Sequence, residues 1–173
     1  MSDTLITVIA IGLSAVLMFI FPLMTMSDRT DEISQLVVET ATTEFVDEIR
    51  TTGKITPSKY DKFQQSINST GNLYNVEMQV QILDENPGKK TTQTVVDRIG
   101  ENEYYAVYTS QIEEVLNNNK NYTLKEGDII SISVKNTNQT LAQQLKNFFY
   151  TVVGNDTYTI AASHGGIVTA TGQ

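Results

Sequence analysis

The sequence predicts an α+β fold in which one long N-terminal helix packs on a small, mainly antiparallel β-sheet with additional short helices. Three observations support this prediction. An uncharged apolar run, Leu5–Met26, passes directly into an amphipathic pattern that reaches Arg50. Two later stretches, Leu73–Asp84 and Asp128–Asn136, alternate apolar and polar residues, which is the period of half-buried strands. Segments with helical spacing separate these strands, and such a mixture of elements is typical of α+β domains.

The apolar run Leu5–Met26 is long enough to cross a membrane. As one helix it would extend about 33 Å, at roughly 1.5 Å per residue, which matches the hydrocarbon core of a bilayer. A removed secretory signal peptide is the alternative interpretation. Only Asp3 precedes the run as a charged residue, however, and no small-x-small cleavage site follows it. We therefore expect residues 1–26 to be a retained transmembrane or assembly helix.

Four residues in this run are candidates for contacts between helices. Ala10 and Ser14 form a small-xxx-small pair, which lets two helices approach closely, and Gly12 lies between them. Pro22 cannot donate a backbone hydrogen bond, so we expect a bend at this residue. The predicted helix–helix assembly residues are Ala10, Gly12, Ser14 and Pro22.

Residues 27–52 continue the helix with one apolar face. Apolar side chains recur every three or four positions and form a stripe along it. This stripe consists of Ile33, Leu36, Val37, Ala41, Phe45 and Ile49. Gly53 is the predicted C-terminal stop. We expect the stripe to pack the helix against a head domain formed by residues 53–173.

The head begins with a short helix, because Thr56-Pro57 supplies an N-cap followed by Pro at the first helical position. The helix is predicted to end near Thr70. Besides the two clear strands, the other predicted elements are a turn at Glu85–Lys90, a weaker strand at Thr91–Ile99, helices at Asn102–Asn117 and Thr137–Val153, and a C-terminal hairpin that pairs Tyr158–Ala162 with Gly166–Ala170.

The charge of the chain limits its partners. It contains 12 Lys and Arg against 20 Asp and Glu, for a net charge of −8. A net-negative domain attracts neither phosphate backbones nor anionic headgroups, so nucleic acid is not expected as a partner. Cys is absent, which excludes disulfides and thiol sites.

Signatures of catalytic and cofactor sites are missing from the sequence. The single histidine, His164, excludes multi-His metal centres, and neither a GxxxxGK[ST] phosphate loop nor a GxGxxG fingerprint occurs. Ser163 beside His164 suggests a nucleophile with its base, but both fall in a predicted Gly-rich turn, where polar residues are ordinary. We therefore predict no enzyme, no cofactor and no metal site.

Two further groups of residues are predicted to be structural. The spacing of a calcium loop is imitated by Asn117, Asn119, Asn121 and Asp128. Tyr122 occupies the position that needs Gly in such a loop, so a polar helix-ending loop is the better interpretation. A possible aromatic patch consists of Tyr104, Tyr105 and Tyr108. At helical spacing these tyrosines are predicted to lie in the core.

The layout of the chain resembles a known family. Its N-terminal helix is apolar and uncharged, with Pro22 late in the apolar part, and it continues as an amphipathic helix to about Arg50 and into a single α+β head. This layout is similar to that of type IV pilins, pseudopilins and Tad-type pilus proteins. The resemblance implies that the apolar half anchors the subunit in the membrane before assembly and packs in the filament core afterwards. It also implies copies of itself or other pilin-like subunits as partners, and a head outside the cell. The family's basic leader, and the Glu near the start of its mature helix, have no counterpart in this sequence.

Two functional hypotheses follow. The first is a structural subunit, major or minor, of a surface filament or of a related secretion or conjugation apparatus, which assembles through its apolar helix. The second is a single-pass, membrane-anchored, extracytoplasmic binding module of an envelope complex that does not polymerise. The distribution of basic residues favours neither orientation strongly, because Arg29 is the only one close to the apolar run.

Overall fold

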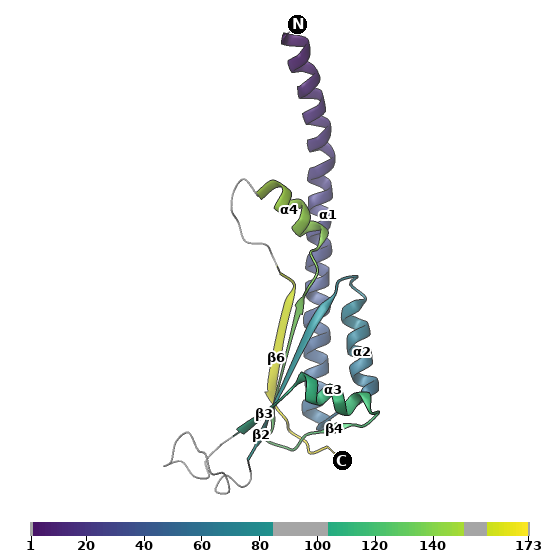
Figure 1. Cartoon of the computed structure of the whole chain (residues 1–173), viewed down its shortest axis with the longest axis vertical. Helices are drawn as coiled ribbons and strands as arrows, with labels where there is room; N and C mark the ends of the chain where they lie inside the picture. Colours follow the sequence, from purple (N-terminus) through teal and green to yellow (C-terminus); the bar gives the residue numbers. More distant parts are fainter. Residues whose placement is uncertain (1, 85–103, 151–158, 173) are drawn as a thin grey trace, which may run out of the picture.

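The structure is a computed structural model that describes residues 2–84, 104–150 and 159–172. The described residues form one helix of 51 residues, three further helices and antiparallel sheets of two and four strands. Figure 1 shows a long helix whose C-terminal half lies in a small head and whose N-terminal half extends free of it. The α+β prediction is confirmed, and the architecture is pilin-like in combining a long apolar N-terminal helix with a small antiparallel sheet.

Helix α1 (Ser2–Thr52) is continuous through the apolar run and the amphipathic pattern, as predicted. Pro22 lies inside it. Gly53 ends the helix with a φ of 66°, and its amide donates to the carbonyl of Ile49 at 2.8 Å. The positive φ is the reason for glycine at this position, since a residue with a Cβ is strained there.

The four-stranded sheet has the order β3-β2-β5-β6, with every pair antiparallel. Its strands are β2 (Tyr74–Leu83), β3 (Tyr104–Tyr108), β5 (Ile129–Asn136) and β6 (Ala161–Ile167). The register pairs Met78 with Ile132 and Val80 with Ile130, so these apolar side chains share one face of the sheet. All four are buried, which confirms the alternation seen in the sequence.

Helices cover the apolar face of this sheet. The C-terminal half of α1 packs against β5 and β6, and α2 (Pro57–Asn68) packs against α1. The ring of Phe45 stacks on that of Phe63 with 4.5 Å between their centroids. Helix α3 (Thr109–Asn117) adds Ile112 and Leu116 to the same core. Helices α1, α2 and α3 therefore contribute their apolar faces to one hydrophobic core.

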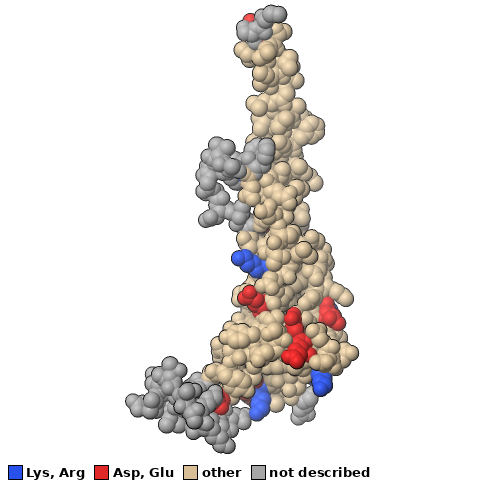
Figure 2. Space-filling model, viewed as in Figure 1, with Lys and Arg blue, Asp and Glu red and all other residues tan. Residues whose placement is uncertain are grey.

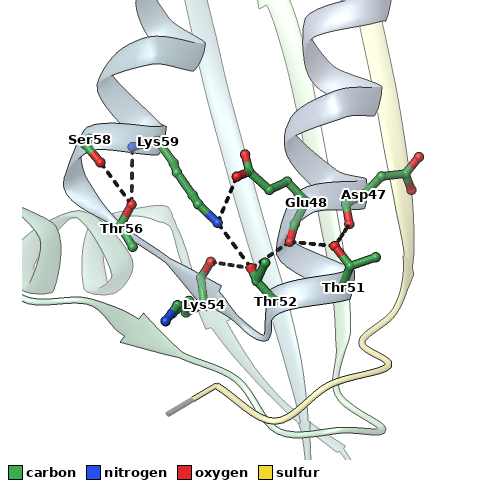
Figure 3. Close-up of polar contacts among 8 residues, drawn as sticks. All are labelled: Asp47, Glu48, Thr51, Thr52, Lys54, Thr56, Ser58 and Lys59. Atoms are coloured by element: carbon green, nitrogen blue, oxygen red, sulfur yellow. Dashed lines mark hydrogen bonds and ion pairs between the residues drawn. The ribbon is translucent and has the colours of Figure 1, made fainter.

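The end of α1 is joined to the start of α2 by polar contacts. Thr56 caps α2 by accepting from the amide of Lys59 at 3.3 Å, with Pro57 as the first helical residue, as predicted. Figure 3 shows the Lys59 side chain reaching back to α1, where its Nζ lies 3.0 Å from Glu48 Oε1 and 3.3 Å from Thr52 Oγ1. A partly exposed ion pair of this kind contributes about 0–1 kcal/mol, so it orients the two helices more than it stabilises them.

Side chains of α1 also occupy the open edge of strand β6. The Gln35 amide donates to the carbonyl of Ala161 at 2.7 Å and accepts from its N–H at 3.0 Å. At the other end, Arg50 Nε donates to the carbonyl of Ile167 at 3.0 Å. Unpaired edge groups invite pairing with another chain, and here α1 satisfies them at both ends of the strand.

The remaining elements lie at the two ends of the head. Strands β1 (Lys54–Ile55) and β4 (Tyr122–Thr123) form the two-stranded sheet near the end of α1. Helix α4 (Leu141–Tyr150) packs on α1 at the opposite end, where the free part of α1 begins (Figure 1). The predicted helix Thr137–Val153 thus corresponds to α4 over the described residues.

The predicted packing stripe on α1 is correct at its C-terminal end and wrong at its start. Phe45 and Ile49 are buried, and Ala41 is partly buried against the core. Val37 is only half-buried, whereas Ile33 and Leu36 are each 63% exposed. The buried residues that the prediction missed are Ser27, Asp31, Ser34, Val38, Thr42 and Val46.

The error has a physical cause. The true buried face includes hydroxyl residues such as Ser34 and Thr42, which a search for apolar side chains passes over. Ser34 donates to the carbonyl of Thr30 at 2.9 Å, and Thr42 donates to that of Val38 at 2.7 Å. Because each hydroxyl is satisfied within the helix, it can be buried without an unpaired polar group.

Two other elements differ from the prediction. Residues 104–117 form strand β3 followed by α3, where one helix was expected. The predicted C-terminal hairpin is wrong, because β6 runs unbroken through Ser163-His164-Gly165. Glycine is needed at position 165 of β6 for close approach, because a Cβ there would lie 2.8 Å from the backbone carbonyl oxygen of Ile130, and a Cβ on Gly166 would displace the Arg50 side chain, whose Nε it would meet at 2.6 Å. The predicted turn Glu85–Lys90 and strand Thr91–Ile99 lie outside the described residues.

The two classes of α1 residue differ in their expected effect on stability. Phe45→Ala removes a buried, stacked ring and should lower the free energy of unfolding by about 3–5 kcal/mol. Leu36→Ala truncates an exposed side chain and should change it by less than about 0.5 kcal/mol. Urea unfolding followed by circular dichroism measures both. Equal losses would mean that Leu36 packs on the head after all.

Candidate assembly and membrane surface

The N-terminal half of α1 exposes a large apolar surface. None of its most apolar stretch is buried within the molecule, and the helix is long and apolar enough to cross a membrane. The exposed large side chains up to Met26 are Leu5, Ile6, Val8, Ile9, Ile11, Leu13, Val16, Leu17, Met18, Phe19, Phe21, Leu23 and Met26. Figure 2 shows this part of the molecule without charge apart from its tip, whereas Lys, Arg, Asp and Glu lie lower, on and near the head.

Such a surface is unfavourable in water. Each large apolar side chain gains about 1.5–3 kcal/mol when it is fully transferred out of water. The transfer free energy of a few such side chains therefore equals the whole free energy of unfolding of a typical domain, which is about 5–15 kcal/mol. An exposed apolar surface of this extent indicates contact with lipid or with other protein chains.

The four predicted assembly residues all lie on this free part of α1. Ala10, Gly12, Ser14 and Pro22 are exposed, and a Cβ added at Gly12 would meet no atom of the chain within 4 Å. These positions lie on more than one side of the helix, and each is therefore open to a neighbouring helix or to lipid. Whether two helices meet at these residues stays a prediction.

The apolar surface continues past the end of the predicted membrane span. We call the residues Phe19, Met26, Ile33 and Leu36 the outer stripe. They are separated by seven, seven and three positions, which places them on one side of the helix. Their exposed fractions are 74%, 67%, 63% and 63%. Leu36 lies ten residues beyond Met26, or about 15 Å along the helix.

Polar side chains pack α4 against α1 where the apolar span ends. Asp31 is 6% exposed and accepts from Thr140 Oγ1 at 2.6 Å. One turn nearer the N-terminus, Asp28 Oδ1 lies 2.6 Å from Lys146 Nζ. Two carboxylates close to the apolar span thus have partners, which lowers the cost of holding them near lipid.

The geometry of β6 separates the residues that had suggested a nucleophile and its base. Ser163 and His164 are neighbours in one extended strand, so their side chains point to opposite faces of the sheet. His164 Nε2 lies 3.6 Å from Asp47 Oδ1 on α1. Among the residues that the structure describes, no group of three His, Asp or Glu side chains is arranged to hold a metal ion.

The tyrosines of β3 lie at the surface, so their prediction as core residues is wrong. Tyr104, Tyr105 and Tyr108 are 38%, 46% and 58% exposed. The prediction failed because it assumed a helix, in which these positions share one face. In the edge strand β3, Tyr104 and Tyr108 lie on one face of the sheet and Tyr105 lies on the other.

Comparison with protein families, with curated proteins and with solved structures finds no match to this chain. The assignment of its function therefore depends on the chemistry of the surface described above.

One buried tyrosine gives the head a dependence on pH. Burial raises the pKa of Tyr60. The Tyr60 hydroxyl donates a hydrogen bond to Glu113 Oε1 at 2.6 Å, and this carboxylate raises the pKa further because it favours the protonated hydroxyl. The folded chain thus binds this proton more tightly than the unfolded chain, in which the pKa is 10.0. Its contribution to stability is complete below pH 10 and is lost as the pH rises above that value.

Tyr60→Phe should therefore reduce the fall in the free energy of unfolding between pH 10 and pH 12. Urea unfolding at several pH values measures the slope. Tyr104→Phe, which removes an exposed hydroxyl, is the matched control and should leave the slope unchanged. An equal slope for Tyr60→Phe and the wild type would show that the proton on Tyr60 is not linked to folding.

The head should not need the apolar half of α1 in order to fold. A chain that begins at Ser27 keeps every core residue, because the buried residues of α1 all lie at or beyond this position. It should be soluble without detergent, with a cooperative unfolding transition, whereas the full chain should need detergent or lipid. Size-exclusion chromatography and circular dichroism test this. Aggregation of the shortened chain, with a soluble full chain, would assign residues 2–26 to the core instead.

Proposed function

We propose that this protein is a pilin-like structural subunit of a surface filament, or of a related secretion or conjugation apparatus, that assembles through the apolar half of α1. Before assembly this half would anchor the subunit in the membrane, with the head outside the cell. After assembly it would pack against the same helix of neighbouring subunits. The protein would then act by its shape and its contacts and not by catalysis.

The extension of the outer stripe beyond the membrane span is the observation that carries this proposal. A bilayer core is about 30 Å thick, so lipid tails that cover Leu5–Met26 do not reach Leu36. Ile33 and Leu36 nevertheless remain exposed and apolar, in line with Phe19 and Met26. A neighbouring helix that runs alongside α1 would cover the span and these two residues together. Lipid alone would leave them in water.

Helix association in a membrane does not gain from the hydrophobic effect, because lipid tails are as apolar as Leu. Close packing has to supply the attraction, and small residues allow it. Gly12, which lies on the same side of the helix as Phe19, would provide such a contact within the span, and the pair Ala10 and Ser14 would provide one on the opposite side, toward a second neighbour. Ile33 and Leu36 would add a hydrophobic contribution in the aqueous part, where burial of apolar surface is favourable.

An anchored binding module that does not polymerise is the second candidate. The sheet face opposite α1 favours it, because the strands present mostly polar side chains there, including the exposed Glu77 and Lys135. Gln79, Gln81, Ser131 and Ser133 alternate with the core residues of β2 and β5 and are partly exposed. A face of this composition suits a polar protein partner. Polymerisation is the property that separates the two candidates.

Substitutions in α1 distinguish assembly from simple anchoring. Gly12→Leu and Ser14→Leu make the span more apolar, so they should preserve insertion but prevent close contact between helices and lower the filament yield several-fold. Leu36→Gln should also lower the yield, while the stability of the head stays unchanged. The measurement is the amount of sheared filament relative to total membrane protein, by immunoblot and electron microscopy.

Glu32→Ala, an exposed change on the same helix beside the outer stripe, is the control and should leave the yield unchanged. Equal yields from all four variants would remove helix packing from the account. If the wild type forms no filament and is recovered only in detergent-soluble complexes, the anchored binding module replaces the filament subunit.

A further inference from the structure

Helix α4 runs back from the head toward the membrane span. Its first contact with α1 joins Thr140 to Asp31, and its next joins Lys146 to Asp28. Successive residues of α4 thus meet positions of α1 that lie progressively closer to Met26. Figure 1 shows the same course: α4 leaves the top of the head beside α1 and points away from the sheet.

When Leu5–Met26 spans the membrane, these contacts between α4 and α1 lie at the level of the lipid headgroups. Asp28 is two residues beyond Met26, or about 3 Å, and Asp31 is five residues beyond it, or about 8 Å. The headgroup region of a bilayer extends about 5–8 Å on each side of the hydrocarbon core. With Leu5–Met26 in the membrane, α4 begins at the outer limit of this region and runs into it.

The side of α4 that faces away from α1 carries Leu141 and Leu145, with the polar Gln144 beside them. Ala142 and Gln143 are buried, whereas Leu141 is 52% exposed, Gln144 is exposed and Leu145 is partly buried. The sequence of α4 ends with the aromatic residues Phe148, Phe149 and Tyr150. Aromatic residues are enriched at membrane–water interfaces, and amphipathic helices bury such a face at the boundary between headgroups and acyl chains.

We propose that α4 is a membrane-interface helix, which inserts the side carrying Leu141 and Leu145 into the same bilayer leaflet that α1 leaves. This inference rests on the membrane anchoring in the proposed function. The lipid is zwitterionic in this account, since the chain has a net charge of −8 and Lys146 is already paired with Asp28. The head would then be attached to the membrane at two points, which fixes its tilt and rotation before assembly.

The absence of tryptophan from the chain allows a direct test. Single tryptophans are introduced into the full-length protein by Leu141→Trp and Leu145→Trp. Each variant is reconstituted into vesicles of phosphatidylcholine with and without bromine on the acyl chains, because bromine quenches tryptophan only at close range. Phe19→Trp, within the span, is the positive control. Tyr108→Trp, exposed on β3 at the far end of the head, is the negative control.

The inference predicts a blue-shifted emission and clear quenching by brominated lipid for Leu141→Trp and Leu145→Trp, intermediate between the two controls. Quenching of Phe19→Trp alone, with both α4 variants as unquenched as Tyr108→Trp, would overturn the inference and leave the anchoring intact. Blue-shifted but unquenched emission from the α4 variants would also overturn it, because a second copy of the protein, and not lipid, would then cover α4. An unquenched Phe19→Trp would overturn the anchoring itself and the inference with it.

Discussion

The structure of the head depends on the packing of one half of α1 across strands β5 and β6. The buried face of this half, which includes Val38, Val46 and Ile49, lies in the same core as the apolar face of the sheet. The same helix also completes the open edge of β6 through Gln35 and Arg50. A single helix thus supplies the cover for the sheet and the protection of its edge, so the sheet and α1 should fold as one unit.

This constraint determines what the other half of α1 can do. The sheet and α2 occupy the helix from about Val38 onward, and polar contacts with α4 occupy it from Ser27 to Asp31. In the span that precedes them only Ile20 and Met24 are partly covered, and none of its most apolar stretch is buried. A helix that is apolar all round needs lipid or other helices around it, because its burial in the head is not available. The account of function follows from this division into a half that belongs to the head and a half that belongs to the surroundings.

Much of this fold could be predicted from the sequence, and the errors have identifiable causes. Strong local signals predict several elements. The period of apolar residues predicts the long helix and the strands β2 and β5, a glycine predicts the stop at Gly53, and a capping residue followed by Pro predicts the start of α2 at Thr56. The start of the packing stripe was misassigned because buried hydroxyls such as Thr42 satisfy themselves within the helix and look polar in the sequence. The glycines of β6 were taken for a turn because their real role, close approach to β5 and to Arg50, involves residues distant in the chain. The apolar surface of the candidate site was evident from the span itself, but its continuation to Leu36 required knowledge of which face the sheet covers.

The central claim is that α1 changes its surroundings at Ser27, from lipid or neighbouring helices to water and the head. Because the chain has no cysteine, single cysteines can be placed along α1 and treated, on open membrane sheets, with a maleimide that does not enter lipid. The account predicts no labelling at Met18 and Phe19, no labelling at the buried Val38, and rapid labelling at Glu32 and Thr43. Labelling of Met18 and Phe19 as fast as that of Thr43 would contradict it.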